Sequence, residues 1–131
     1  MTTAMMCMAL AIYFEARSET LVAQHMVAEV IMNRVASPKY PSEVCAVIQQ
    51  DLGPNDHDCQ FSFYCDGVPE TIDDVVAFEK ALWAGIDVIT GAHERVLPTN
   101  TMWYHTKAVA PSWSGNLVHV SMSEAHHFYK E

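Results

Sequence analysis

The sequence has few positively charged residues and no long apolar run. Its 131 residues include seven Lys and Arg against sixteen Asp and Glu, a formal net charge of −9. Such a charge opposes binding to nucleic acid or to anionic lipid, so we expect neither partner. No stretch approaches the roughly 20 consecutive apolar residues that span a bilayer, and we therefore expect no membrane insertion.

A cleaved export signal is not expected at the N-terminus either. Residues 5–11 are apolar, but no Lys or Arg precedes them, and the run is short for the hydrophobic part of a signal peptide. We therefore expect synthesis in the cytoplasm without a signal peptide.

The chain also lacks internal repeats and low-complexity segments. Half of its residues are hydrophobic, and a chain of this length buries roughly two-thirds of the surface that it exposes when unfolded. We expect a single domain over residues 1–131, and a monomer.

The spacings typical of zinc sites are absent. The sequence contains neither a Cys-x-x-Cys pair nor a His-Glu-x-x-His helix. His57, Cys59 and Cys65, with distant His105 or His126, supply suitable ligand types, so a zinc site remains the alternative to our expectation of no metal and no cofactor.

The four cysteines allow two interpretations. Cys7 lies within the first apolar segment, where we expect a reduced thiol in the core. Cys45, Cys59 and Cys65 lie in or beside a long loop, and a disulfide between Cys59 and Cys65 is the alternative to free thiols there.

The periodicity of apolar residues predicts an α+β chain that is mainly α. Helices are expected over 4–14, from Thr20 as N-cap to residue 36, over 41–50, and from 71 to 90, where Gly91 ends the last one. The last helix should bury the face that carries Val75, Phe78, Leu82, Ile86 and Ile89. Residues 51–70 are typical of a long loop, and short strands are expected over 101–105 and 117–121, which gives the C-terminal third a small β element.

Two glutamates follow the first apolar segment. Residues 4–14 carry no charge, so a helix there is buried, and Glu15 emerges from its last turn. The helix C-terminus and the apolar neighbours both raise a carboxyl pKa, and Glu19, four residues on, adds a like charge if the helix continues. A glutamate with a raised pKa stays protonated near neutrality and can act as a general acid. The alternative is a frayed helix end with two solvated glutamates.

Three segments of the chain carry motifs that belong together. They are 13–35, with YFEARSE and VAEVIMNRV; 40–63, with YP, VC and CQFSF; and 104–129, with YH, PSW and HHFY. Together these segments resemble the SleB-type cell wall hydrolases, the spore-cortex-lytic family. Their order and approximate spacing agree from about residue 9 to residue 129. Ser18 departs from the pattern, since the family usually has glycine there, beside the proposed acid.

The resemblance implies a lysozyme-like or lytic-transglycosylase-like domain that cleaves peptidoglycan glycan strands between N-acetylmuramic acid and N-acetylglucosamine. It implies that Glu15 is the acid and then the base, while the sugar's own hydroxyl attacks and leaves a 1,6-anhydromuramyl end. Glu19 then either tunes Glu15 or assists a water in a hydrolytic variant. Hydrolysis with two carboxyl groups needs them on either side of the bond, which neighbours on one helical turn do not provide. Asp56, Asp58 or Asp66 is the alternative partner.

Polar and aromatic side chains further along the chain are candidates for binding the glycan. Gln60 and Ser62 offer neutral donors and acceptors suited to hydroxyl and acetamido groups. Sugar rings present apolar faces to aromatic side chains. The C-terminal third supplies four candidates of these kinds, Tyr104, His105, Trp113 and His126.

A wall hydrolase without an export signal resembles a bacteriophage endolysin, which reaches the wall through a membrane lesion made by another protein. Two other classes stay open. A metal-dependent amidase or peptidase would need a ligand cluster, and a non-catalytic wall-binding protein would keep the aromatic groove without needing Glu15.

Overall fold

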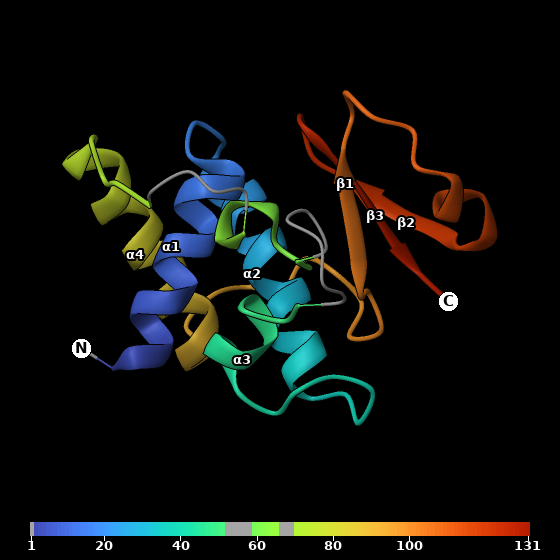
Figure 1. Ribbon diagram of the computed structural model, residues 1–131, viewed down its shortest axis with the longest axis horizontal. Helices are drawn as coiled ribbons and strands as arrows, with labels where there is room; N and C mark the ends of the chain where they lie inside the picture. The colour runs from blue at the N-terminus through green and yellow to red at the C-terminus, as the bar shows by residue number, and fades with distance from the viewer. Residues whose placement is uncertain (1, 52–58, 66–69) are drawn as a thin grey trace.

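The computed structural model describes residues 2–51, 59–65 and 70–131, and places helices in the first part of the chain and a small sheet in the last (Figure 1). The elements are α1 (Thr3–Ala16), α2 (Leu21–Val35), α3 (Val44–Ile48), the short 3-10 helix η1 (Ser62–Tyr64), α4 (Val75–Thr90), β1 (Trp103–Thr106), the 3-10 helix η2 (Ser112–Asn116), β2 (Val118–Met122) and β3 (His126–Lys130). The predicted mainly α class with a small C-terminal β element is confirmed.

Helices α1 and α2 form the centre of the helical part. Thr20 caps α2, as predicted, because its hydroxyl accepts a hydrogen bond from the Ala23 amide at 3.2 Å. Thr2 caps α1 in the same way, with the Met5 amide as donor. Helix α1 buries apolar side chains, whereas α2 buries both apolar and polar ones, and α3 is shorter than the predicted 41–50. No helix in the described part of the chain is long and apolar enough to cross a membrane.

Helix α4 differs from its prediction in both its start and its buried face. Asp74 is the N-cap, so the helix begins at Val75 rather than at 71. The expected apolar face is only partly buried or exposed, and Val75 is 71% exposed. The residues that α4 buries are instead small or compact, namely Ala81, Ala84, Gly85 and Val88.

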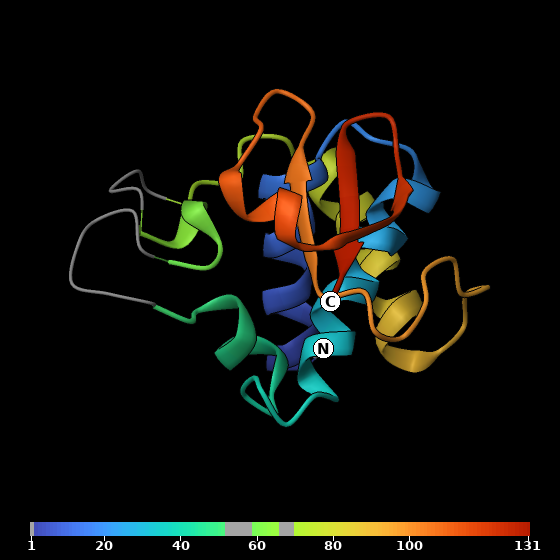
Figure 2. The same ribbon diagram turned by 90° about the vertical axis from the view of Figure 1, so that its right-hand side faces the viewer.

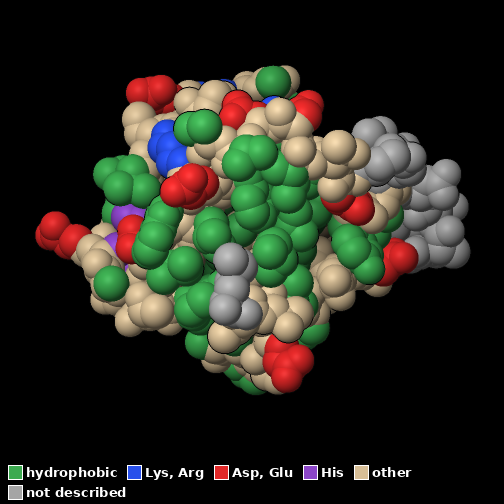
Figure 3. Space-filling view, turned by 90° about the vertical axis from the view of Figure 1, so that its left-hand side faces the viewer, with side chains coloured by type: hydrophobic (Ala, Val, Ile, Leu, Met, Phe, Trp, Pro, Cys, Tyr) green, Lys and Arg blue, Asp and Glu red, His purple; other side chains and the backbone are tan. Residues whose placement is uncertain are grey.

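The close approach of α1 and α4 explains this orientation. A Cβ atom at Gly85 would lie 2.9 Å from Cγ of Met8, so any larger residue at that point would displace the Met8 side chain. Where two helices pack this closely, the size of a residue decides whether it fits between them, and its hydrophobicity matters less. The larger apolar side chains are left toward solvent, and Figure 3 shows hydrophobic side chains gathered on the side where α4 and α1 lie.

The sheet has three antiparallel strands in the order β1-β3-β2. Two of them match the predicted segments within one or two residues, but the central strand β3 was not predicted. Its sequence HHFYK shows no alternation of polar and apolar residues that would predict a strand. In the structure, the two histidines nevertheless lie on opposite faces, with His126 buried and His127 on the other side. Figure 2 views the molecule from the side of the sheet that faces away from the helices.

Two disulfides join the four cysteines. Cys7 on α1 is bonded to Cys45 on α3, so the prediction of a reduced thiol at Cys7 is wrong. The apolar setting of Cys7 indicated burial in the core, but no local pattern indicates that α3 packs against α1 there. Cys59 is bonded to Cys65, which removes both from the set of potential metal-binding thiolates.

Buried polar groups of α2 hold the segment that leads into the sheet. The Glu29 side chain is fully buried and accepts a hydrogen bond from the Leu97 amide at 2.7 Å. One turn further on, the Asn33 amide group donates to the Thr101 carbonyl at 2.9 Å. Because residues 93–101 pass directly into β1, these contacts fix where that strand lies relative to α2.

Candidate active site

Glu15 lies in the last turn of α1 and faces strand β1. The Tyr104 hydroxyl donates a hydrogen bond to Glu15 Oε1 at 3.1 Å. Tyr104 lies on the face of the sheet toward the helices, where its ring contacts those of Phe61, His126 and Phe128. The contact fixes one of the two carboxyl oxygens of Glu15.

The surroundings of Glu15 favour its protonated form. Burial raises the pKa of the Glu15 carboxyl above its usual 4.5, and the charge of Glu19 adds a smaller increase. The hydrogen bond from Tyr104 and the positive charge of Arg34 lower that pKa, but the net shift is upward. The predicted raised pKa therefore agrees with the structure, and burial is its main cause.

Arg34 is a component of the site that the sequence did not single out. Its side chain is buried near the C-terminal end of α2, and its Nε donates to the Met102 carbonyl at 2.8 Å. With the Gln60 amide oriented so that its oxygen faces the guanidinium, that oxygen accepts from Nη1 and Nη2 at 2.9 Å each. Arg34 thus ties the Gln60 segment to β1. Arginine is seldom buried without partners, so its position in a largely apolar helix was the available signal.

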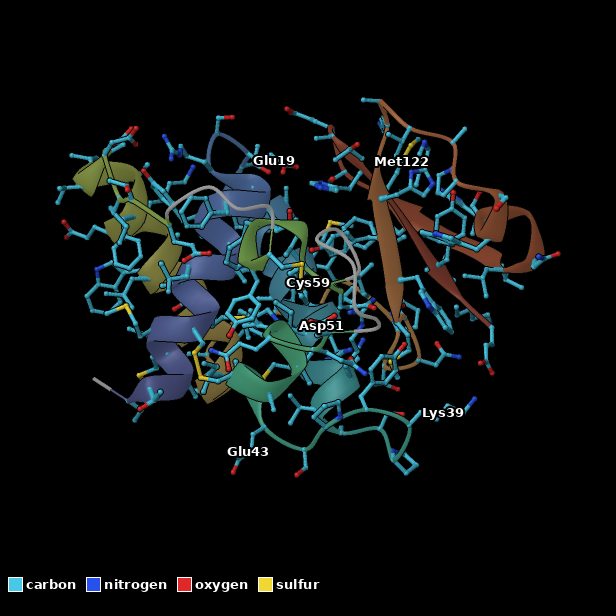
Figure 4. All side chains as sticks on the ribbon, in the orientation of Figure 1. Glu19, Lys39, Glu43, Asp51, Cys59 and Met122 are labelled. Carbon is cyan, nitrogen blue, oxygen red and sulfur yellow. A yellow bond between two sulfur atoms is a disulfide. The ribbon has the colours of Figure 1, made fainter. Side chains whose placement is uncertain are left out.

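Glu19 lies in the turn after α1, since that helix ends at Ala16, and not on a continued helical turn as expected. Its side chain is 10% exposed, and Nδ1 of His126 is 3.3 Å from its carboxylate (Figure 4). The Ser123 hydroxyl donates to the same carboxylate at 3.5 Å, and Lys80 Nζ donates to the Glu19 backbone carbonyl at 2.7 Å. Glu19 therefore links the α1–α2 turn to the β2–β3 turn.

The remaining predicted binding residues divide between two places. Gln60 and His126 lie on the Glu15 side, in contact with Arg34 and Glu19 respectively. His105 follows Tyr104 in β1 and points to the opposite face, where its ring meets those of Trp113 and Tyr129. The structure therefore does not bring His105 and Trp113 together with Glu15.

Five of the residues named from the sequence lie wholly or partly outside the described residues. They are Asp56, His57, Asp58 and Asp66, together with the side chain of Ser62. Within residues 2–51, 59–65 and 70–131, no group of three or more His, Cys, Asp or Glu side chains is arranged to hold a metal ion.

A partly buried carboxyl group with a raised pKa, held by one neutral donor, is the arrangement of enzymes that work by general acid catalysis. The chain belongs to the cell wall hydrolase family, whose model matches residues 18–129. The match begins three residues after Glu15 and includes Glu19, Arg34 and Tyr104.

Solved structures with the same fold extend the similarity to nearly the whole chain. The catalytic domain of the germination-specific lytic transglycosylase SleB from Bacillus anthracis is 26% identical, with a TM-score of 0.76 over 99% of this chain and 96% of that one. The catalytic domain of the Bacillus cereus SleB protein is 29% identical, with a TM-score of 0.74 over 97% and 89%. No curated protein sequence matches the chain significantly.

Proposed function

We propose that this chain cleaves peptidoglycan glycan strands at the bond between N-acetylmuramic acid and N-acetylglucosamine, with Glu15 as acid and base. The observation that carries the proposal is the Glu15 carboxyl group, whose pKa is raised by burial and whose Oε1 is held by Tyr104. Membership of the cell wall hydrolase family and the likeness to SleB catalytic domains supply the substrate class.

The proposed reaction needs one proton donor that becomes a proton acceptor. Protonated Glu15 gives its proton to the glycosidic oxygen as the bond to C1 of the muramic acid breaks through an oxocarbenium-like state. The Glu15 carboxylate then takes the proton of the C6 hydroxyl of the same sugar as that oxygen bonds to C1. The products are a 1,6-anhydromuramyl end and a free hydroxyl on the leaving sugar, and Glu15 is protonated again. Arg34 stabilises the carboxylate between the two steps, because its charge favours the ionised form.

The surroundings of Glu19 support transglycosylation over hydrolysis. A hydrolase of this kind uses a second carboxylate, either to activate water or to attack the sugar. The Glu19 carboxylate instead accepts hydrogen bonds from His126 and Ser123, which suits a structural link between two turns. The Bacillus anthracis neighbour is a lytic transglycosylase, and this likeness favours the same outcome.

Mass spectrometry of digested sacculi tests the proposed chemistry. We expect muropeptides that end in anhydromuramic acid, about one water lighter than hydrolysed ones, because the attacking oxygen comes from the sugar itself. If the products ended mainly in reducing muramic acid, transglycosylation would be ruled out, but the glycan would still be shown to be cleaved. Released stem peptides, abolished by a chelator, would instead indicate a metal-dependent amidase or peptidase. If both the glycan and the stem peptides stayed intact, the remaining candidate would be a non-catalytic wall-binding protein.

We propose further that the protein acts on the wall outside the cytoplasmic membrane and, as a phage-type endolysin, is released there through a membrane lesion. The two disulfides support an oxidising site of action, since such bonds are rare in the cytosol. Bacteria that express the chain should therefore stay intact and lyse only after the membrane is permeabilised, as followed by culture turbidity. Prompt lysis without permeabilisation would contradict the need for a lesion.

A further inference from the structure

The charge of this acidic chain is distributed unevenly. Residues 101–130, which form the sheet and its connections, contain a single acidic residue, Glu124, together with Lys107 and Lys130. They also contain four of the seven histidines, whereas the other fifteen acidic residues lie elsewhere. Glu131 follows directly, but its carboxylate is paired with Lys39 at 3.0 Å. With two lysines against one glutamate, this segment has a formal charge of +1 before any histidine is protonated, whereas the whole chain has −9.

Three of these histidines share the face of the sheet that points away from Glu15. They come from three different strands, with His105 on β1, His119 on β2 and His127 on β3, and His105 pairs with His127 in the strand register. The ring nitrogens His119 Nε2 and His127 Nδ1 are 2.9 Å apart. The His105 ring stacks on Tyr129, and its Nε2 is 2.8 Å from the Tyr129 hydroxyl.

Trp113 of η2 extends this face with an accessible indole ring. The ring meets His105 and Tyr129 edge-on, with centroid separations of 5.6 and 5.8 Å, and the residue remains 38% exposed. An aromatic ring that is held in place and still open to solvent can stack against the apolar face of a sugar at little entropic cost.

The protonation of this face depends on its own members. The pKa of His127 is lowered by burial first, and then by the positive charges of His119, Lys107 and His105. His119 and His127 also share one hydrogen bond. Histidine side chains in general gain positive charge as the pH falls from 7.5 toward 5.5, where carboxylates remain largely ionised.

We propose that this outer face, formed by His105, Lys107, Trp113, His119 and His127, is a second binding surface for peptidoglycan. A sugar ring of the polymer stacks on Trp113, while the carboxylates of the stem peptides pair with Lys107 and the protonated histidines. The identity of the polymer rests on the proposed function. Because Tyr104 and His126 lie on the other face of the sheet, the glycan strand held here is distinct from the glycan strand that Glu15 cuts. Such a surface offsets the repulsion between the acidic body of the protein and an anionic wall.

Retention on insoluble sacculi tests the surface without digestion if all variants carry Glu15→Gln. We expect retention of the parent to rise roughly three- to tenfold between pH 7.5 and pH 5.5 and to fall with added salt, because two or three exposed charge contacts form. Adding His119→Gln and His127→Gln should remove most of the rise with pH, since His105 is then the remaining histidine of the face. Lys39→Gln, which removes an exposed charge outside this face, should leave the rise unchanged.

Two outcomes would overturn the proposal, and a third measurement separates it from the proposed function. An unchanged pH response in the double histidine variant would overturn it. Equal or stronger retention on anionic vesicles or immobilised DNA would also overturn it, since the surface would then be a general anion binder. Cleavage of the same sacculi by the wild-type protein tests the proposed function separately, so that binding without cleavage, or cleavage without this binding, rejects only one of the two proposals.

Discussion

Glycan cleavage by the Glu15→Gln variant is expected to be about 10²–10⁴-fold slower than cleavage by the wild type. The amide keeps the shape of the side chain and can still accept the hydrogen bond from Tyr104, but it has no carboxyl proton to give. Reaction rates measured from the soluble products of purified sacculi would establish the effect. A variant that kept more than about half of the wild-type rate would show that Glu15 is not the acid.

Glu19→Gln is the matched control, since it makes the same chemical change four residues away. We expect a milder loss of rate, because Glu19 contacts His126 and Ser123 and serves to position the turn. Removing its charge should also lower the Glu15 pKa, because that charge raises it. The rate should fall as the pH rises through the Glu15 pKa, and in Glu19→Gln this alkaline limb should lie at a lower pH.

Stability provides a second check that Glu15→Gln acts on chemistry rather than on folding. Because the folded-state pKa of Glu15 is raised, the ionised carboxylate is less favourable in the folded than in the unfolded protein. The stability that Glu15 contributes is present below its unfolded pKa and is lost as the pH rises through its folded pKa. The Gln variant should therefore be at least as stable as the wild type at neutral pH, as measured by thermal unfolding.

The sequence predicts those parts of the fold that depend on local chemistry. The Thr20 cap, the charge-free first helix and the helix end at Gly91 follow from neighbouring residues, and all are present. The buried face of α4 was not predictable in the same way, because hydrophobicity favours Phe78 and Leu82 over glycine. The approach of Met8 to Gly85 decides which face is buried, and that contact joins residues 77 positions apart in the sequence.

The candidate site shows the same division. The raised pKa of Glu15 was predictable from its apolar helix, and the resemblance to a family indicated Tyr104. The position of Arg34 beside Glu15 depends on how α2 and β1 pack, which the sequence does not reveal. The face that each residue of β1 occupies depends on strand register, so Tyr104 meets Glu15 while His105 faces the other way.

Glu29→Ala is expected to lower the free energy of unfolding by about 3–5 kcal/mol, because it leaves several hydrogen-bond donors without an acceptor, each at a cost of about 1–3 kcal/mol when buried. The Glu29 carboxylate is fully buried and accepts from His93 Nε2 at 2.9 Å and from the amides of Val96 and Leu97 at 3.0 and 2.7 Å. Alanine leaves these donors without an acceptor and opens a cavity between α2 and the segment that leads into β1.

Urea denaturation followed by circular dichroism would measure the loss, with Glu79→Ala as the control. Glu79 is an exposed glutamate on α4, so the same substitution there should change the free energy of unfolding by less than about 0.5 kcal/mol. A loss below about 1 kcal/mol for Glu29→Ala would contradict the proposed anchoring role. Since Glu29 holds the segment that leads into β1, the folded fraction of this variant should also cleave glycan more slowly, because Tyr104 and Arg34 then lose their fixed positions around Glu15.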